Sequence, residues 1–173
     1  MERITISSRI DAKIFKDFAY FDILKRQKKW RAPAIFAALM LTFAIVCFSQ
    51  SGQKEGAVML GTVLSVIALL IPFSYFFTFN SSLNKQAARQ GIIRPRVIYN
   101  VELNGDGVEV KNEKETAKFG WDGIYRIYYM NNCVYLYVAP TRAFLLPEAE
   151  IKCGIDTLWQ FLQAHLPAEK LFK

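Results

Sequence analysis

Two long stretches without a charged residue constrain this chain more than any other feature of its sequence. No charged residue lies between Arg31 and Lys54, a run of 22 positions, or between Glu55 and Lys85, a run of 29. A helix needs roughly 20 apolar residues to cross a hydrocarbon core about 30 Å thick. The sequence therefore predicts two transmembrane helices joined by a short polar hairpin.

The two predicted spans cover about residues 33–51 and 57–79. Neither contains Asp, Glu, Lys, Arg or His, although proton relays and ion paths usually need an ionisable group inside the membrane. We therefore interpret the pair as an anchor, or at most a subunit interface. Small residues spaced four apart would let the two helices approach closely. They are Ala34, Ala38 and Thr42 in the first span and Gly61 and Ser65 in the second.

The basic residues of the chain lie beside the predicted spans. Residues 1–31 carry nine Lys or Arg against four Asp or Glu, and residues 80–96 add four basic residues and no acidic one. Residues 97–173 are slightly acidic, with eight basic against ten acidic residues. By the positive-inside rule, both termini are cytoplasmic. This distribution argues against nucleic-acid binding, which needs cations clustered on the folded domain.

Basic residues flanking the spans are also candidates for contact with lipid headgroups, which makes membrane lipid an expected partner. Each Lys or Arg near the surface is worth about 1 kcal/mol of attraction to anionic lipid. The simpler interpretation, which we favour, is that these residues only set the orientation of the spans. The candidates are Lys25, Arg26, Lys28, Lys29, Arg31, Lys85 and Arg89.

No pattern in the sequence indicates catalysis or a bound cofactor. Cys47, Cys133 and Cys153 lack the CxxC or Cys/His spacing of a metal site. The single histidine, His165, has no nucleophile and acid around it in a known signature. Since no acid/base pair or nucleophile elbow is visible either, we expect a non-enzymatic protein with no cofactor, metal or small-molecule substrate.

The N-terminal residues 1–31 predict a strand followed by an amphipathic helix, both cytoplasmic. Arg3 to Ile10 alternates with the period of two that is typical of a strand. Asp11 can cap the helix, whose apolar stripe includes Phe15 and Phe18. This helix either lies along the headgroup boundary or docks on the cytoplasmic domain. Whether the strand joins a C-terminal sheet stays open.

After a basic juxtamembrane linker at 81–96, residues 97–173 predict a small antiparallel β domain. Asn104-Gly105-Asp106-Gly107 is a strong hairpin signal, and further turns are predicted at 112–114, 131–132 and 139–141. The final helix carries an apolar face that would cover the sheet. The fold class is therefore membrane α+β, a transmembrane hairpin plus a PH-like (pleckstrin-homology-like) domain. The predicted elements are strands at 98–103, 108–111, 115–120, 124–130, 133–138 and 143–146, and a helix at 155–166.

Four segments of this domain carry a resemblance to a known family. They are LNGDGVEV at 103–110, FGWDGIYRI at 119–127, YLYV at 135–138 and RAFLLP at 142–147. The chain resembles the YcxB-like family of bacterial membrane proteins over essentially its full length. The resemblance implies a membrane-tethered PH-like domain in the bacterial inner (plasma) membrane, and it implies no established activity and no catalytic residues. Glu148 stands where we expect a basic residue, so no basic contact is carried over there.

The segment around Trp121 separates into two predicted faces. Trp121, Ile124 and Tyr128 would pack in the core if residues 121–124 form a helical turn. The opposite face would then present tyrosine and arginine, which are typical anchors of protein interfaces. The candidate partner surface is Tyr125, Arg126 and Tyr129.

The sequence therefore favours a non-enzymatic membrane protein that presents a PH-like domain to another protein, or to a second copy of itself. The alternative is an immunity or protective membrane protein that neutralises a membrane-acting toxin through the spans themselves. Binding of inositol phosphates at the first hairpin is disfavoured, because Asp106 and Glu109 would repel phosphate.

Overall fold

The chain folds into two compact units, which are described separately. The computed structural model describes residues 3–50, 52, 54–92, 94–113 and 115–173. The β domain combines Met1–Phe18 with Ala87–Lys173, and the helical hairpin comprises Ala19–Gln86. Ser51, the predicted end of the first span, and Lys114, part of a predicted turn, lie outside the described residues. The helical hairpin is thus inserted into the β domain within the chain.

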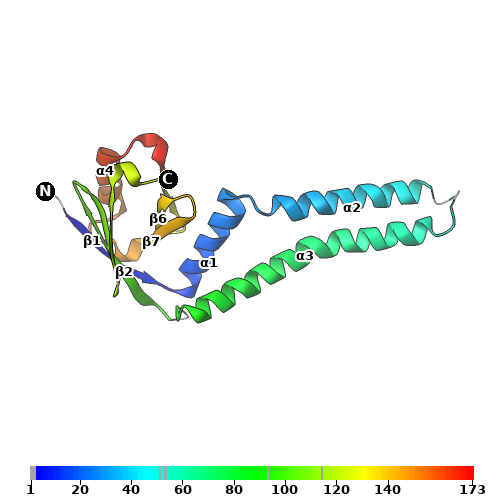
Figure 1. Ribbon diagram of the computed structural model, residues 1–173, viewed down its shortest axis with the longest axis horizontal. Helices are drawn as coiled ribbons and strands as arrows, with labels where there is room; N and C mark the ends of the chain where they lie inside the picture. Colours follow the sequence, from blue (N-terminus) through cyan, green and yellow to red (C-terminus); the bar gives the residue numbers. More distant parts are fainter. Residues whose placement is uncertain (1–2, 51, 53, 93, 114) are drawn as a thin grey trace. The chain divides into compact units, whose positions relative to one another are not determined.

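The β domain contains two four-stranded sheets (Figure 1). In the first sheet the order is β1-β2-β3-β4, and every neighbouring pair is antiparallel. The N-terminal strand does join the C-terminal strands, since Ile6 of β1 pairs with Val101 of β2. The strands of this sheet are β1 (Ile4–Ile10), β2 (Arg96–Asn104), β3 (Gly107–Lys111) and β4 (Thr116–Gly120).

The second sheet has the order β7-β6-β5-β8. Its first three strands are antiparallel hairpin neighbours, whereas β8 pairs with β5 in parallel. The sequence did not predict β8, because two residues are too short for a periodic signal. The strands are β5 (Arg126–Met130), β6 (Cys133–Ala139), β7 (Arg142–Pro147) and β8 (Leu171–Phe172).

One hydrophobic core fills the space between the sheets and α4 (Ile155–His165). Alternate residues of each strand point into it, as the period of two requires. Val101 of β2, Leu136 of β6 and Leu158 of α4 are all fully buried in this core. The predicted antiparallel domain with a C-terminal helix is therefore confirmed.

The turn between β2 and β3 shows why Asn-Gly-Asp-Gly specifies this hairpin. The Asn104 side-chain oxygen accepts hydrogen bonds from the backbone N–H groups of Asp106 and Gly107, each 3.0 Å long. Gly107 has a φ of +150°, and a Cβ there would lie 2.1 Å from the Phe119 carbonyl oxygen. Only glycine avoids that clash at this position.

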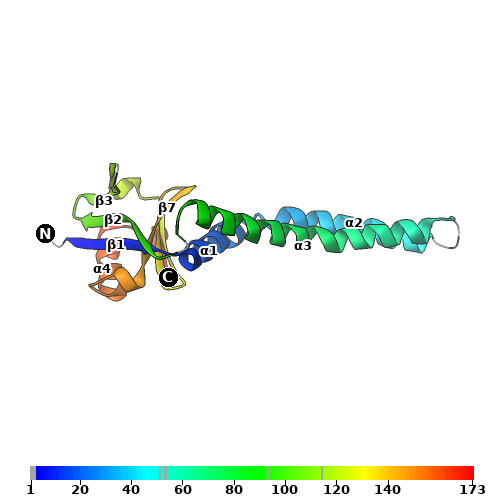
Figure 2. The same ribbon diagram turned by 90° about the horizontal axis from the view of Figure 1, so that it is seen from below.

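The helical hairpin consists of two antiparallel helices, α2 (Arg31–Ser49) and α3 (Ala57–Arg89), which lie side by side in Figures 1 and 2. Both are long and apolar enough to cross a membrane, and only 11% of each apolar window is buried. A core helix of a water-soluble protein would be mostly buried instead. The two predicted apolar helices are therefore confirmed.

Small side chains form the seam between α2 and α3. Ala44 and Ala68 are buried, and a Cβ on Gly61 would lie 2.9 Å from the Phe48 ring. The expected contribution of Gly61 is thus correct, but Ala38 on the first helix is exposed. The reason is periodicity: residues repeated every four positions drift off a seam that repeats every 3.5.

Helix α3 is longer than predicted. Its 33 residues extend about 50 Å at 1.5 Å per residue, and it continues to Arg89 through much of the region predicted as a linker. Gly91 ends it with a φ of +67°. The N–H of Gly91 donates to the Ala88 carbonyl and that of Ile92 to the Ala87 carbonyl, both at 3.1 Å, which is a Schellman cap.

The N-terminal helix α1 (Ala12–Tyr20) continues into a short π-helix, η1 (Phe21–Arg26). The Asp11 side chain accepts a hydrogen bond of 2.8 Å from the Ile14 N–H, as predicted for a cap. Phe18 packs its ring edge-on to Tyr135, with centroids 5.2 Å apart. Of the two alternatives for this helix, the structure favours docking of its first two turns on the β domain.

Candidate functional site

The outer face of the second sheet is rich in tyrosine. On β6, Tyr135 and Tyr137 point away from the core; both are buried, and the Phe18 ring of α1 packs against each of them. Tyr128 of β5 continues this row, with its ring centroid 5.7 Å from that of Tyr137. Helix α1 therefore contacts one part of an aromatic face that extends beyond it to β5 and β8.

The part of this face next to β8 is formed by Tyr125, Arg126, Tyr128 and Phe172, which we call the Tyr125 surface. The Arg126 guanidinium lies 5.3 Å from the centroid of the Tyr125 ring and 5.5 Å from that of Phe172. Tyr128 stacks on Phe172 at 4.8 Å. The exposed fractions of Tyr125 and Phe172 are 38% and 39%. Within the described part of the β domain, Val97 is the other exposed large hydrophobic residue.

The structure reverses the predicted placement of Tyr128 and Tyr129. Tyr129 packs against the core, while Tyr128 lies on the outer face with Arg126. The cause is that β5 begins at Arg126, so the alternation sends residues 126 and 128 outward and Ile127 and Tyr129 inward. The Tyr129 hydroxyl donates to Glu148 at 2.7 Å, and this hydrogen bond raises the pKa of Tyr129.

Phe172 is the member of the Tyr125 surface that the sequence analysis missed. It lies in β8, beside Tyr128 in the parallel register. A cavity of about 510 Å³ adjoins the surface and is lined by both apolar and charged residues. Its lining includes Ile124, Tyr125, Arg126, Val138, Glu169 and Lys170.

Trp121 has a structural role at one end of the β domain. Its indole N–H lies 3.1 Å from the carbonyl oxygen of Asn104 and 3.2 Å from that of Gly105, so it is tied to the β2–β3 turn. Its ring packs on His165, with centroids 5.0 Å apart. The His165 Nδ1 lies 2.8 Å from the Phe161 carbonyl oxygen. These contacts agree with core packing for Trp121, and they show that His165 belongs to the same aromatic cluster.

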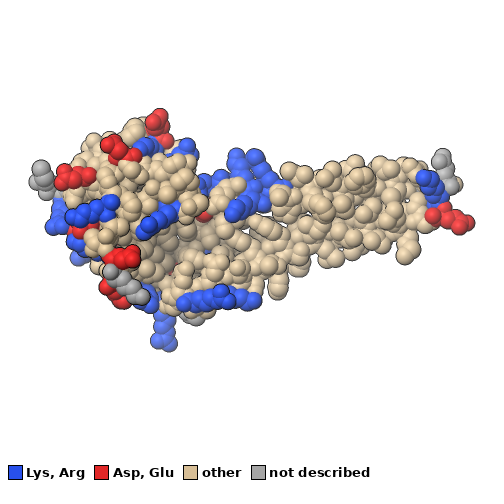
Figure 3. All heavy atoms as spheres, in the orientation of Figure 1, with Lys and Arg blue, Asp and Glu red and all other residues tan. Residues whose placement is uncertain are grey.

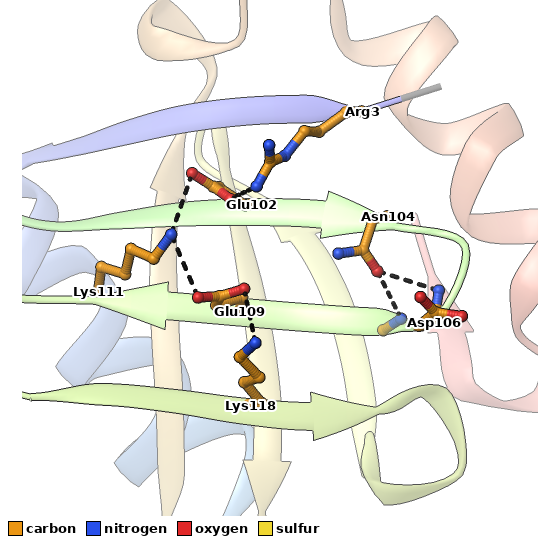
Figure 4. Close-up of polar contacts among 8 residues, drawn as sticks. Arg3, Glu102, Asn104, Asp106, Glu109, Lys111 and Lys118 are labelled. Carbon is orange, nitrogen blue, oxygen red and sulfur yellow. Dashed lines mark hydrogen bonds and ion pairs between the residues drawn. The ribbon is translucent and has the colours of Figure 1, made fainter. Parts of the chain in front are cut away.

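A ladder of charges covers the outer face of the first sheet (Figure 4). Glu102 and Glu109 are directly opposite each other on β2 and β3. Lys111 bridges them, at 3.5 Å from Glu102 and 3.2 Å from Glu109, while Arg3 pairs with Glu102 and Lys118 with Glu109. The hydrogen bond from Lys111 lowers the pKa of Glu109 and raises that of Lys111. Since these lysines face carboxylates, the ladder gives no support to a phosphate site beside the first hairpin.

Comparison with protein families identifies the β domain. Residues 103–152 match the model of the YcxB-like protein family. Over this segment the chain is similar to the YcxB-like family. The match confirms the family resemblance over residues 103–152, while comparisons with curated proteins and with solved structures give no match. The YcxB-like match contains Tyr125, Arg126 and Tyr128, whereas Phe172 lies beyond it.

The candidate lipid contacts lie outside the YcxB-like match and fall into two groups: one residue that forms an ion pair, and residues that form none among the described residues. Arg26 forms an ion pair of 2.6 Å with Asp22, and both side chains are about 15% exposed. The other six candidates are exposed, and no ion pair joins them to any residue in the described ranges. They are Lys25, Lys28, Lys29, Arg31 and Lys85 in the helical hairpin and Arg89 in the β domain.

The cysteines show no arrangement for redox or metal chemistry. Cys133 is buried in the YcxB-like domain, and burial raises its pKa to about 12. Cys153 is exposed, and Cys47 is partly buried in the helical hairpin. Among the residues that the structure describes, no group of three or more His, Cys, Asp or Glu could hold a metal ion.

Proposed function

We propose that this chain is a non-enzymatic docking protein of the bacterial inner membrane. Its YcxB-like domain, cytoplasmic and PH-like, binds a second protein through the Tyr125 surface. The observation that carries the proposal is the position of Arg126 between two exposed rings, Tyr125 and Phe172. Tyrosine and arginine are enriched among the residues that dominate protein interfaces.

The membrane anchoring in this proposal is supported by the exposure of the apolar side chains of α2 and α3. Figure 3 shows the flanks of these helices without charged side chains on the face drawn, and basic side chains gather at one end. Lys54 and Glu55 lie at the opposite end, in the short loop between the helices. This asymmetry supports cytoplasmic termini.

The PH-like arrangement is supported by the order of elements in the β domain. Strands β1 to β4 form one antiparallel sheet, β5 to β7 form the antiparallel part of the other, and α4 follows them. The helical hairpin is inserted between β1 and β2. Because β1 and β2 are paired neighbours, the inserted segment leaves and rejoins the domain at two residues that face each other across the strands, Ile10 and Arg96.

The Tyr125 surface is suited to a small and transient interface. The surface area that two partly exposed rings and one guanidinium can bury is far less than the 1,200–2,000 Å² of total area that stable complexes bury. The adjoining cavity is lined by apolar residues such as Val138 and by charged residues such as Glu169 and Lys170. We expect a partner to place one side chain in this cavity while its backbone lies against Tyr125 and Phe172.

The test is site-specific photo-crosslinking of the full chain in its native membrane. A photoreactive amino acid replaces Tyr125 in one variant, Phe172 in a second and Val97 in a third, the last being the matched control on another exposed apolar residue. We expect one protein to crosslink at positions 125 and 172 in stoichiometric amount, to be absent at 97, and to be lost in Arg126→Glu. Equal yields at all three positions, or crosslinks only to a second copy of this chain, would contradict docking to another protein.

The immunity function remains a prediction from the sequence. Gly61 packs against Phe48, and the Ser65 hydroxyl donates to the Gly61 carbonyl at 2.8 Å. Both residues are therefore engaged within the helical hairpin. A toxin acting in the membrane would meet outward residues such as Thr62, so substitutions there test this alternative more directly than changes at Gly61.

A further inference from the structure

A cluster of four exposed cations lies at the start of the first apolar helix. Lys25 is in the last turn of η1, Lys28 and Lys29 are in the connection, and Arg31 is the first residue of α2. All four side chains are exposed. The next 22 residues carry no charge, so the four cations stand together at one end of an apolar helix.

Local acids do not neutralise this cluster. Asp22 is the nearest carboxylate in the sequence, and it already accepts hydrogen bonds from Arg26 and Gln27. No ion pair connects Lys25, Lys28 or the rest of the cluster to any carboxylate in the part of the chain that the structure describes. Four like charges within seven residues repel one another. An anion at this position would relieve that repulsion.

The length of α2 and the position of Trp30 indicate where such an anion would be found. The 19 residues of α2 extend about 28 Å, close to the thickness of the hydrocarbon core. If α2 crosses the membrane, the cluster lies at the level of the lipid phosphates. Trp30, with 48% of its surface exposed, stands between Lys29 and Arg31. Tryptophan is enriched at this depth of the membrane.

We propose that Lys25, Lys28, Lys29 and Arg31 form a binding seat for the phosphate group of an anionic phospholipid. The inference goes beyond docking through the Tyr125 surface and rests only on the membrane-spanning part of the proposed function. A free phosphate ion would satisfy the same charges, but it has no acyl chains to lie along the exposed apolar face of α2. A phospholipid is therefore the ligand that fits both the four cations and the exposed apolar face of α2.

The test uses the full chain in phosphatidylcholine vesicles that contain brominated phosphatidylglycerol or brominated phosphatidylcholine. Bromine quenches nearby tryptophan, and subtraction of the Trp30→Phe variant isolates the emission of Trp30 from that of Trp121 and Trp159. We expect phosphatidylglycerol to be preferred at Trp30 by roughly fivefold or more, the factor that one basic group near the surface supplies. The variant with all four cations changed to Gln should lower the preference to near one.

Two matched controls test whether the preference depends on the four cations themselves or only on the total charge of the protein. Lys54→Gln removes a cation from the opposite end of the helical hairpin, and the double change Asp22→Asn with Arg26→Gln removes a neutralised pair. Both should keep the wild-type preference. Incorporation into the vesicles and the emission of Trp121 and Trp159 show whether each variant is inserted and folded.

Three results would overturn the lipid seat. The first is equal quenching by the two brominated lipids in the wild type. The second is an unchanged preference in the four-Gln variant. The third is loss of the preference on addition of inorganic phosphate but not of sodium chloride at the same ionic strength, which would assign the cations to soluble phosphate. None of these results bears on crosslinking at Tyr125, so the two proposals fail separately.

Discussion

The β domain and the helical hairpin treat the same residue types in opposite ways. Leu136 of the β domain is fully buried, whereas Leu69 of α3 is 70% exposed. In water an exposed apolar helix pair would be unfavourable, since each large apolar side chain gains about 1.5–3 kcal/mol by burial. The β domain excludes water from a core, whereas the two helices expose leucine and phenylalanine, as helices that contact lipid do.

Charges follow the same division. On the first sheet, Glu109 and Lys111 belong to a ladder in which acids and bases face one another. At the start of α2, Lys28 and Lys29 have no such partner among the described residues. The acids and bases of the ladder are paired within the fold, whereas the cations at the start of α2 are those for which we propose an anion outside the chain.

The largest effect should come from a cavity in the β-domain core. Leu136→Ala removes a fully buried side chain, and changes of this kind cost about 2–5 kcal/mol. We expect the free energy of unfolding of the β domain to fall by that amount while the helical hairpin stays in the membrane. Urea unfolding in vesicles, followed by the emission of Trp121 and Trp159, measures it. Val97→Ala, at an exposed position, should change the midpoint little; equal losses in the two variants would contradict the assigned core.

The next largest effect should separate the two helices. In Gly61→Leu the new side chain meets the Phe48 ring, which a Cβ alone would approach within 2.9 Å, and overpacking typically costs about 1–3 kcal/mol. We expect α2 and α3 to move apart without loss of helix. Spin labels on the outward residues Ile45 and Leu69 would report a longer distance by pulsed resonance spectroscopy. Thr62→Leu adds similar bulk on an exposed position and should leave the distance unchanged.

Much of this architecture could be predicted from local sequence signals. The charge-free runs indicated both apolar helices, and Asn104 with its glycine neighbours indicated the first hairpin. These signals suffice because each depends on residues that are adjacent in the chain: hydropathy over one helix length, or turn chemistry over four residues. The residues at the contact between α2 and α3 were harder to predict. Ala38 and Ala44 have the same side chain, and only the period of the helix packing decides that Ala44 is buried and Ala38 is exposed.

The candidate surface could be predicted only in part. Tyr125 and Arg126 are predicted to face outward, and the structure agrees. Tyr129 is also predicted to face outward but packs against the core. A shift of one position in the start of β5 exchanges the inward and outward faces for every later residue of the strand. The role of Phe172 could not be predicted from the sequence, because its contact with Tyr128 joins residues 44 positions apart through a two-residue strand. Contacts of this kind depend on tertiary packing and leave no periodic trace in the sequence.

A smaller effect should follow from loss of the turn signal itself. Asn104→Ala leaves the backbone N–H groups of Asp106 and Gly107 without the acceptor they have at 3.0 Å. A net hydrogen bond is worth about 0.5–1.5 kcal/mol, and water can replace the acceptor at this exposed turn. We expect the free energy of unfolding of the β domain, measured by urea unfolding, to fall by about 1 kcal/mol. Asn104→Asp retains an acceptor oxygen and should be close to the wild type. If the aspartate variant were as unstable as the alanine variant, the turn would not depend on that oxygen.

The smallest effect should come from the charge ladder. Glu109→Gln removes the pairs with Lys111 and Lys118, but it also removes the repulsion from Glu102 directly opposite. Exposed ion pairs contribute little and are screened by salt. At neutral pH the thermal midpoint of the β domain should therefore change only slightly, and less at high salt.

The sign of the pH dependence distinguishes this variant from the others. The hydrogen bond from Lys111 lowers the pKa of Glu109 below its ordinary value of 4.5. Its contribution to stability is therefore present above pH 4.5 and is lost as the pH falls through the lower pKa of the folded state. We expect the midpoints of wild type and Glu109→Gln to differ most at neutral pH and to converge in acid, as thermal melts at several pH values would show. If the wild type instead melted below Glu109→Gln at neutral pH and the two converged in acid, Glu109 would destabilise the folded sheet when charged, and the ladder would then be a source of repulsion that the buried core of the β domain has to offset.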